Sequence, residues 1–415
     1  MSNTRKALFL VAVFLAKVAQ GQEVLTLDQI ITEISQNNPS LKAYESLIKS
    51  EEAKVEGAGA WTAPMVGGGT FMTPYPGSKV IDESDRGAWI LSAEQDIPNP
   101  AKTKAKKEYL KTRSETYLHG RNERLNELRT KARQLYFDLL ISYKKLRFQK
   151  EGLGIIKTMR KLAELRYPYN QGTLGQIFKT EGRTFEADNM LEMTLAEIRS
   201  AKIDLNTLMH RSPTLDLEVD TATLVSFDPI ANIDTAYFAE NRSDIRHMEH
   251  DIYSMKLNIN QMRQEAKPDF KIRFEHMSTR AAMMPNQYTL MGMVSIPIAP
   301  WSSKMYKSEV KSMSLEREAM QEQKEGMLSQ MLGMTKSMEN ELITMQKQLS
   351  NYESKILPAL NKNLKVSMIS YQENKADLNT VIDGWEAVNM AQMNYIGQLQ
   401  NFYQMIVEYE KNIER

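Results

Sequence analysis

Two kinds of periodic segment follow each other along the chain: short alternating stretches and long polar stretches with helical spacing. In residues 90–108, ILSAEQDIPNPAKTKAKKE, apolar and polar side chains alternate up to Ile97-Pro98, and lysines and helix formers follow Pro100. The same order returns in residues 290–309, LMGMVSIPIAPWSSKMYKSE. Alternation predicts a strand, and proline ends a strand ladder but is tolerated where a helix begins. We therefore predict two strand-to-helix junctions, at Pro98, Pro100, Pro297 and Pro300.

The alternating segments have one apolar and one charged face. Phe270, Ile272 and Phe274 alternate with Lys271 and Arg273. This pattern is typical of strands in an outer-membrane barrel, and a half-buried sheet in a soluble protein alternates in the same way. The smallest spanning barrels need about eight strands, so a membrane-spanning sheet requires several chains to share one barrel. Strands are predicted near residues 65–75, 87–97, 268–278 and 288–298.

The polar stretches predict helices of two lengths. Residues 101–166 would form one helix of about 100 Å, and residues 27–60 and 174–209 would form two helices of about 50 Å each. The later part of the chain predicts the same set, over residues 302–370, 236–266 and 378–412. Gly152, Gly154 and Pro358 fall at matching points of the two longest helices and are expected to loosen them there.

These matches indicate an internal duplication with an offset of about 204 residues, far longer than the unit of a solenoid. Pro64 aligns with Pro268, and Ile97-Pro98 aligns with Ile296-Pro297. Two further segments align, YPYNQGTLGQIF from Tyr167 and YQENKADLNTVI from Tyr371. The predicted organisation is a signal peptide, a first repeat, a linker and a second repeat, over residues 1–21, 22–210, 211–235 and 236–415.

The N-terminus and the composition indicate an exported protein. Arg5 and Lys6 precede an apolar run that is shorter than the ~20 residues needed to span a bilayer, which is typical of a cleaved signal peptide. The formal net charge is +1, so no broad basic field favours nucleic acid. The chain has no cysteine, which excludes disulfides, thiolate sites and a lipid-bearing N-terminal cysteine.

The sequence contains no arrangement that predicts an enzyme. It has no Ser/His/Asp arrangement, no Gly-rich phosphate loop and no metal-ligand cluster of useful spacing, so neither catalysis nor a cofactor is expected. A protein of another class, a periplasmic coiled-coil scaffold that does not span the membrane, would explain the long helices. It would leave the alternating strands and their proline stops without an explanation.

The duplicated strand-to-helix junctions and the segments 167–179 and 371–383 resemble the TolC family of outer-membrane efflux proteins. The resemblance covers essentially the whole mature chain and implies a mainly α fold with a small β part. It implies a homotrimer whose long antiparallel helices form an α-barrel and whose protomers each give four strands to a shared 12-stranded transmembrane β-barrel. The expected location is the outer membrane of a Gram-negative bacterium, in contact with outer-membrane lipid and extending into the periplasm.

By the same resemblance the protein is a passive exit duct of a tripartite efflux pump. Its partners would be a periplasmic adaptor protein and an inner-membrane pump of the RND type. The cargo stays open: copper, silver or other heavy metals are one candidate, and drug efflux or type I protein secretion is the alternative.

In the family the two aligned segments form the periplasmic tip, and the present chain departs from their usual pattern. The family has a tyrosine, a glycine three residues later, and acidic residues six and nine positions after that glycine. Asparagine replaces the glycine and tolerates the left-handed backbone of such a turn. One acidic position keeps its charge, and we hypothesise that Lys179 and Asp383 contact each other and hold the tip closed. The candidate tip residues are Asn170, Gln176, Lys179, Asn374, Asp377, Thr380 and Asp383.

Methionine is unusually frequent, with 27 residues, and much of it follows heptad spacing. Such a stripe can fill the seam between two long helices. Thioethers also bind soft cations such as Cu(I), and His247 and His250 lie within one helical turn of Met248. Both interpretations stay open. The candidate metal-binding residues are His247, Met248, His250, Met313, Met320, Met327 and Met334.

Overall fold

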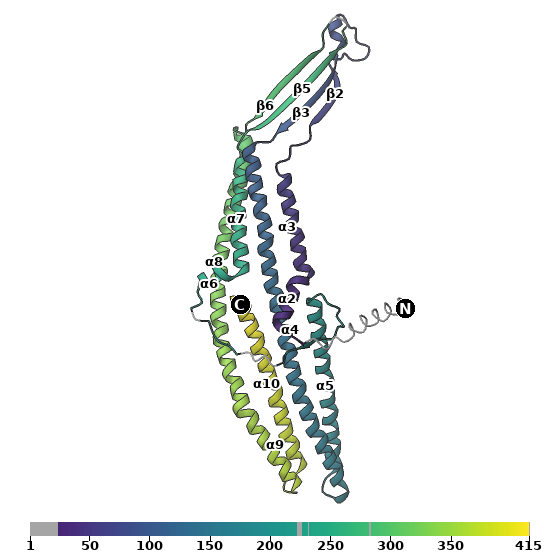
Figure 1. Ribbon diagram of the computed structural model, residues 1–415, viewed down its shortest axis with the longest axis vertical. Helices are drawn as coiled ribbons and strands as arrows, with labels where there is room; N and C mark the ends of the chain where they lie inside the picture. The colour runs from purple at the N-terminus through teal and green to yellow at the C-terminus, as the bar shows by residue number, and fades with distance from the viewer. Residues whose placement is uncertain (1–23, 222–225, 231, 282–283, 415) are drawn as a thin grey trace, which may run out of the picture. The chain divides into compact units, whose positions relative to one another are not determined.

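The computed structural model describes residues 24–221, 226–230, 232–281 and 284–414 (Figure 1). The predicted signal peptide lies outside the described residues. None of the helices in this part of the chain combines the length and the apolarity that a membrane crossing requires.

The chain divides into two compact units, each built from separate segments. The helical unit contains the chain up to Lys42, Glu123–Arg242 and the residues from Leu328 on. The sheet unit contains Ala43–Asn122 and Ser243–Met327. Each unit takes segments from both predicted repeats, so the repeat boundaries stay a prediction from the sequence.

Long helices make up most of the chain, and the four-stranded sheet lies in the sheet unit (Figure 1). The helices are α2 Leu27–Asn37, α3 Pro39–Gly57, α4 Pro100–Arg166, α5 Leu174–Leu208, α6 Thr235–Asn241, α7 Ser243–Gln264, α8 Pro300–Asn351, α9 Leu357–Gln372 and α10 Leu378–Ile413. The strands are β1 Val24–Leu25, β2 Met65–Phe71, β3 Ala88–Ile97, β4 Glu218–Val219, β5 Asp269–Thr279 and β6 Gln287–Ser295.

The sheet is antiparallel, in the order β2-β3-β5-β6. Its register brings like side chains together on each face, with Phe274 between Ala93 and Leu290, and Arg273 beside Glu94. On the charged face, Lys271 contacts Glu94 and also lies 3.4 Å from Asp96. Cross-strand pairs of this kind stabilise a sheet. The alternation in the sequence therefore favours this register and determines which side chains lie on each face of the sheet.

Two helices that the sequence predicts as continuous are each interrupted, and both predictions were wrong at matching points. α2 and α3 are separated at Asn38, whose extended backbone (φ −63°, ψ 124°) precedes a proline, a setting that disfavours the helical conformation. α6 and α7 are separated at Arg242. Buried polar contacts hold both breaks: the Asn38 side chain donates to Leu208 O at 2.9 Å, and Arg242 donates to Asn412 O at 2.7 Å.

The two longest helical segments differ where both were expected to loosen. A π-helical turn, Tyr352–Ile356, ends two residues before Pro358, because proline cannot continue the regular hydrogen-bond ladder. By contrast α4 is a continuous helix through Gly152 and Gly154, so the expectation was wrong there. The Trp385 indole donates to Gly152 O at 3.0 Å and packs against the helix at this glycine.

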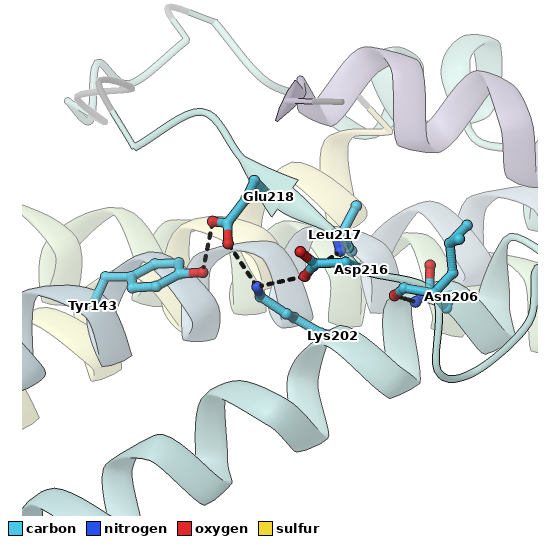
Figure 2. A network of polar contacts seen from close by, with 7 residues as sticks. Tyr143, Lys202, Asn206, Asp216, Leu217 and Glu218 are labelled. Atoms are coloured by element: carbon cyan, nitrogen blue, oxygen red, sulfur yellow. Dashed lines mark hydrogen bonds and ion pairs between the residues drawn. The ribbon is translucent and has the colours of Figure 1, made fainter. Parts of the chain in front are cut away.

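The helical unit has an apolar core between α4, α5, α8 and α10, and the connection after α5 is fixed to it by polar contacts (Figure 2). Tyr143 donates to Glu218 at 3.0 Å, and Lys202 donates to the other oxygen of Glu218 at 2.8 Å and to Asp216 at 3.4 Å. Burial, followed by the hydrogen bond with Glu218, raises the pKa of Tyr143. These contacts hold β4 in place to pair with β1 in a parallel ladder.

Gly87 offers a test of the connection between β2 and β3. Its φ of +76° is unfavourable for other residues, and an added Cβ would lie 2.7 Å from Phe71 O. We expect Gly87→Ala to lower the free energy of unfolding by about 1–3 kcal/mol, measured by urea unfolding in detergent. Gly69→Ala is the control, because a Cβ there meets nothing within 4 Å. Equal stability of the two variants would contradict this account of the turn.

Candidate functional site

The two predicted tip segments form the helical hairpins α4–α5 and α9–α10, both in the helical unit. Asn170 and Asn374 adopt the left-handed conformation that the sequence predicts, with φ of 57° and 59°. Thr173 and Gln176 form a reciprocal capping box at the start of α5, and Asp377 accepts from Leu378 N at 2.8 Å at the start of α10. Both turns are therefore held by their own side chains.

The two hairpins are joined by charge-assisted hydrogen bonds. Arg166, the last residue of α4, donates from Nη1 to Tyr371 O at 2.7 Å and from Nη2 to Gln372 O at 2.9 Å. Its guanidinium also lies 4.2 Å from the centroid of the Tyr371 ring. Gln176 donates to Asp377 Oδ1 at 2.5 Å. Arg166 thus binds the last turn of α9, and Gln176 and Asp377, which cap α5 and α10, are hydrogen-bonded to each other.

The hypothesised contact between Lys179 and Asp383 is not formed. Lys179 donates instead to Asn379 Oδ1 at 3.4 Å, and Asp383 is exposed and takes part in no ion pair among the described residues. Thr380 is exposed as well. An ion pair between the hairpins lies one turn further along α5, where Arg183 Nη2 is 2.8 Å from Glu386 Oε1. The sequence did not single out Arg166 or Arg183, because their carbonyl and carboxylate partners lie about 200 residues away.

An apolar core lies behind these polar contacts. Tyr371, Leu378, Ile382 and Trp385 of the second hairpin pack with Ile156 and Met159 of α4, and all are buried. The Tyr371 hydroxyl is itself buried and has no hydrogen-bond partner among the described residues. The two hairpins therefore pack through apolar side chains and are joined at their ends by the hydrogen bonds of Arg166 and Gln176, which we call the clasp.

At the predicted strand-to-helix junctions, the structure places each proline beside the change of element. β3 ends at Ile97, directly before Pro98, and α4 begins at Pro100. Asn99 caps this helix by accepting from Ala101 N at 3.0 Å, and it donates to Pro268 O at 2.7 Å. In the second copy, β6 ends at Ser295, Pro297 lies in the connection and α8 begins at Pro300.

The structure brings a third histidine to the predicted His247 and His250. The rings of His250 and His119 are 4.8 Å apart, and the nitrogens of His250 lie 3.0 Å from Glu115 and 3.5 Å from Thr116. Met248 is half-buried on the same helix. The described residues hold no group of three or more His, Asp or Glu side chains that could bind a metal ion. His119 was missed because it lies on α4, far away in the sequence.

The methionine stripes are distributed over both units. Met313, Met320 and Met327 of α8 are half-buried, and Met334 is 42% exposed. Met320 and Met255 of α7 line one cavity of about 310 Å³ in the sheet unit. A second series, Met331, Met338 and Met345, packs against the core of the helical unit. Most of these side chains therefore fill helix seams, and one pair meets at a cavity.

Neither a protein-family model nor a curated protein matches the sequence. Solved structures do match over 93% of the chain. The outer-membrane channel OprN aligns with 14% identity, over 89% of its own chain, with a TM-score of 0.76. The chain has the TolC-like outer-membrane channel fold. The outer-membrane protein VceC of Vibrio cholerae aligns with 14% identity over 95% of its chain (TM-score 0.73), and CusC with 13% over 91% (TM-score 0.76). This likeness bears out the mainly α fold with a small β part.

Arg166→Gln tests the clasp between the hairpins. It removes two charge-assisted hydrogen bonds, each contributing about 1.5–3 kcal/mol, so hydrogen exchange in residues 167–179 and 371–383 should become about tenfold faster or more. Lys161→Gln, an exposed substitution on the same helix, should leave the exchange rates unchanged. If both variants exchange at the wild-type rate, Arg166 does not hold the hairpins together.

The histidine cluster predicts a loss of stability in acid. Burial, followed by repulsion from His250, Arg246 and His247, lowers the pKa of His119 from its ordinary value of 6.5, against the attraction of Glu115. The unfolded chain therefore binds a proton more readily than the folded one. The contribution of His119 to the free energy of unfolding is therefore fully present above pH 6.5 and decreases as the pH falls below that value.

The check is the unfolding temperature, measured from about pH 7.5 to about pH 5.5. His119→Gln should flatten the wild-type decrease, while His210→Gln, which lies outside the cluster, should keep it. A decrease of the same size in all three proteins would show that His119 does not cause it.

Proposed function

We propose that this protein is a TolC-family exit duct in the outer membrane of a Gram-negative bacterium, part of a tripartite efflux system. Three protomers would each give four strands to one 12-stranded β-barrel, and their helices would continue as a tunnel into the periplasm. The observation that carries this proposal is the uncovered apolar face of the four-stranded sheet.

That face is unusually exposed for a protein in water. Tyr288, Leu290 and Val294 of β6 are 73%, 67% and 56% exposed, and Trp89 of β3 is 57% exposed. In a soluble antiparallel sheet such a face is packed against other elements, and a contiguous apolar patch of this kind marks an interaction surface. A lipid bilayer covers it without a further protein layer, while the charged face would line the water-filled lumen.

The sheet edges support the shared barrel. β2 and β6 are the edge strands, so each has one row of backbone groups without a strand partner in the described chain. Each unsatisfied group in hydrocarbon costs several kcal/mol, and four strands are too few to close on themselves. Copies of the same chain would pair β6 of one protomer with β2 of the next, which makes oligomerisation a physical requirement of membrane insertion, and the proposed trimer meets it.

We assign the gate to the two hairpins of the helical unit. Arg166 and Gln176 would hold the tip closed, and a periplasmic adaptor and an RND-type pump would release it. Asp383 and Lys179 are exposed charges of opposite sign, so the tip would attract cations less strongly than a fully acidic ring. Catalysis forms no part of the proposal: the pump supplies the energy, and the duct is passive.

Soft-metal cargo is a second candidate, favoured by one observation. Met255 of α7 and Met320 of α8 line the same cavity. Two thioethers at one cavity suit Cu(I) or Ag(I) better than hard cations. We keep drug efflux and polypeptide secretion as alternatives, because the pump selects the cargo.

The functional test is growth of a deletion strain on copper, silver, organic drugs and bile salts. We expect the deletion to sensitise cells to at least one class and the wild-type gene to restore growth. A variant with Met313, Met320, Met327 and Met334 changed to Leu conserves volume, so it should fold. It should restore drug resistance fully and should fail on copper and silver if the methionines bind the cargo.

Extraction provides the outcome that contradicts the duct. A barrel protein leaves the membrane fraction with detergent and resists salt, whereas a periplasmic scaffold is released by salt. Release by salt, together with unchanged growth of the deletion strain, would favour the scaffold.

A further inference from the structure

The sheet continues into a second exposed apolar surface at the second strand-to-helix junction. Ile298 in the connection after β6 is 80% exposed, and Trp301 and Met305 in the first two turns of α8 are 83% and 80% exposed. These three side chains are more exposed than the apolar residues on the adjacent sheet face. An exposed tryptophan beside a membrane-facing sheet is typical of the interface between lipid and water.

The helix itself determines which way these residues face. Ser303, two positions from both Trp301 and Met305, is 3% exposed and therefore lies on the inner side. With about 100° between successive residues, Trp301 and Met305 lie on the side opposite Ser303, and Lys304 lies beside them. The apolar pair and the lysine thus form one outward face, which we call the rim face.

The first junction lacks this surface. Ala101 and Ala105 stand where the second copy has Trp301 and Met305, and Ala105 is 4% exposed. Lys102 is held there by Glu265 at 3.0 Å and by Asp269 at 2.7 Å. The first junction is therefore packed within the sheet unit, whereas the second presents apolar side chains outward.

The charge around the rim face indicates the chemistry of its partner. Lys304 and Lys307 are exposed and make no ion pair with any described residue. The first acidic residue of α8 is Glu309, after both lysines. Long lysine side chains can lie along apolar surface while their ammonium groups reach phosphate at the membrane surface.

We infer that the rim face is a lipid anchor: Trp301 and Met305 insert between the headgroups of the periplasmic leaflet, and Lys304 binds the phosphate of anionic phospholipid. This inference rests on the proposed function, because it requires the sheet to lie in the bilayer. The anchor fixes the depth of the second junction, where a strand inside lipid becomes a helix outside it. The competing occupant is a second copy of the chain.

Fluorescence quenching by brominated phospholipid tests the anchor on the full-length protein in vesicles. The chain has four tryptophans, so single-tryptophan variants are made by changing the other three to Phe. Trp301 alone should be quenched strongly by phospholipid brominated near the headgroup and weakly by phospholipid brominated near the chain ends. Trp385, which is 5% exposed in the helical unit, is the unquenched control.

Trp89 alone separates failure of the anchor from failure of the duct. Quenching of Trp89 without quenching of Trp301 leaves the sheet in the bilayer and overturns the anchor. Absence of quenching at both positions contradicts the proposed membrane insertion itself. If a single-tryptophan variant does not fold, Trp301→Phe in the otherwise native chain should remove the component quenched near the headgroup, and retention of that component overturns the anchor.

The lysines are tested by exchange of the surrounding lipid. Lys304→Gln should weaken the preference for phosphatidylglycerol over phosphatidylcholine about fivefold. Lys307→Gln should leave it unchanged, because Lys307 lies one helical turn from Ser303, on the side away from the rim face. Lys311→Gln, an exposed lysine further along the same helix, should not change that preference. Equal effects of all three substitutions would show that the lipid preference does not arise at the rim face. Chemical crosslinking of Trp301 to a neighbouring protomer, without quenching by lipid, would assign the rim face to a protein contact.

Discussion

The pairing of backbone hydrogen bonds at the two edges of a four-stranded sheet is the constraint on which the remaining structure depends. In the proposed duct the uncovered apolar face of the sheet lies in lipid, where each unpaired N–H or C=O is costly. β2 and β6 each leave one edge open in the described chain. The proposed sharing of the barrel, the proline stops at its border and the long helices beyond it all follow from this requirement, because strand geometry has to end where water can solvate the backbone again.

The two halves that the sequence aligns share several local features in the structure and differ in others. Both copies interrupt the helix before the sheet, at Asn38 and at Arg242, and both end the long helical segment in an asparagine turn. The two halves differ at the hairpins, because Arg166 of the first hairpin donates hydrogen bonds to backbone carbonyls of the second. The contacts between the hairpins are therefore unequal in the two halves, and the second junction presents an exposed tryptophan near its helix start, where the first has the buried Ala105.

Local patterns in the sequence were sufficient for much of this fold. Strand alternation around Phe274, the prolines at the junctions and the left-handed asparagines are properties of a few neighbouring residues, so they could be predicted. The break at Asn38 has a local signal, the following Pro39, which the prediction of one continuous helix overlooked. The break at Arg242 is stabilised by a buried contact with Asn412, and predicting that contact requires knowledge of tertiary packing.

The contacts between the two hairpins could not be predicted from the sequence either. A Lys179–Asp383 contact follows from aligned charges, yet the chain joins the hairpins through Arg166 and the carbonyl oxygens of Tyr371 and Gln372. Backbone acceptors have no sequence signature, so a clasp that uses them cannot be read from residue types. His119 was likewise missed, because His250, Arg246 and His247 lie on α7 and approach it only when α4 and α7 pack together.

Single-channel recording in a planar lipid bilayer tests whether the protein forms a water-filled duct closed at the hairpins. We expect the purified protein alone to insert and conduct ions in small steps, because the hairpins are joined, and Arg166→Gln to conduct in clearly larger steps. Insertion without any conductance, in both the wild type and the variant, would contradict a water-filled duct closed at the hairpins.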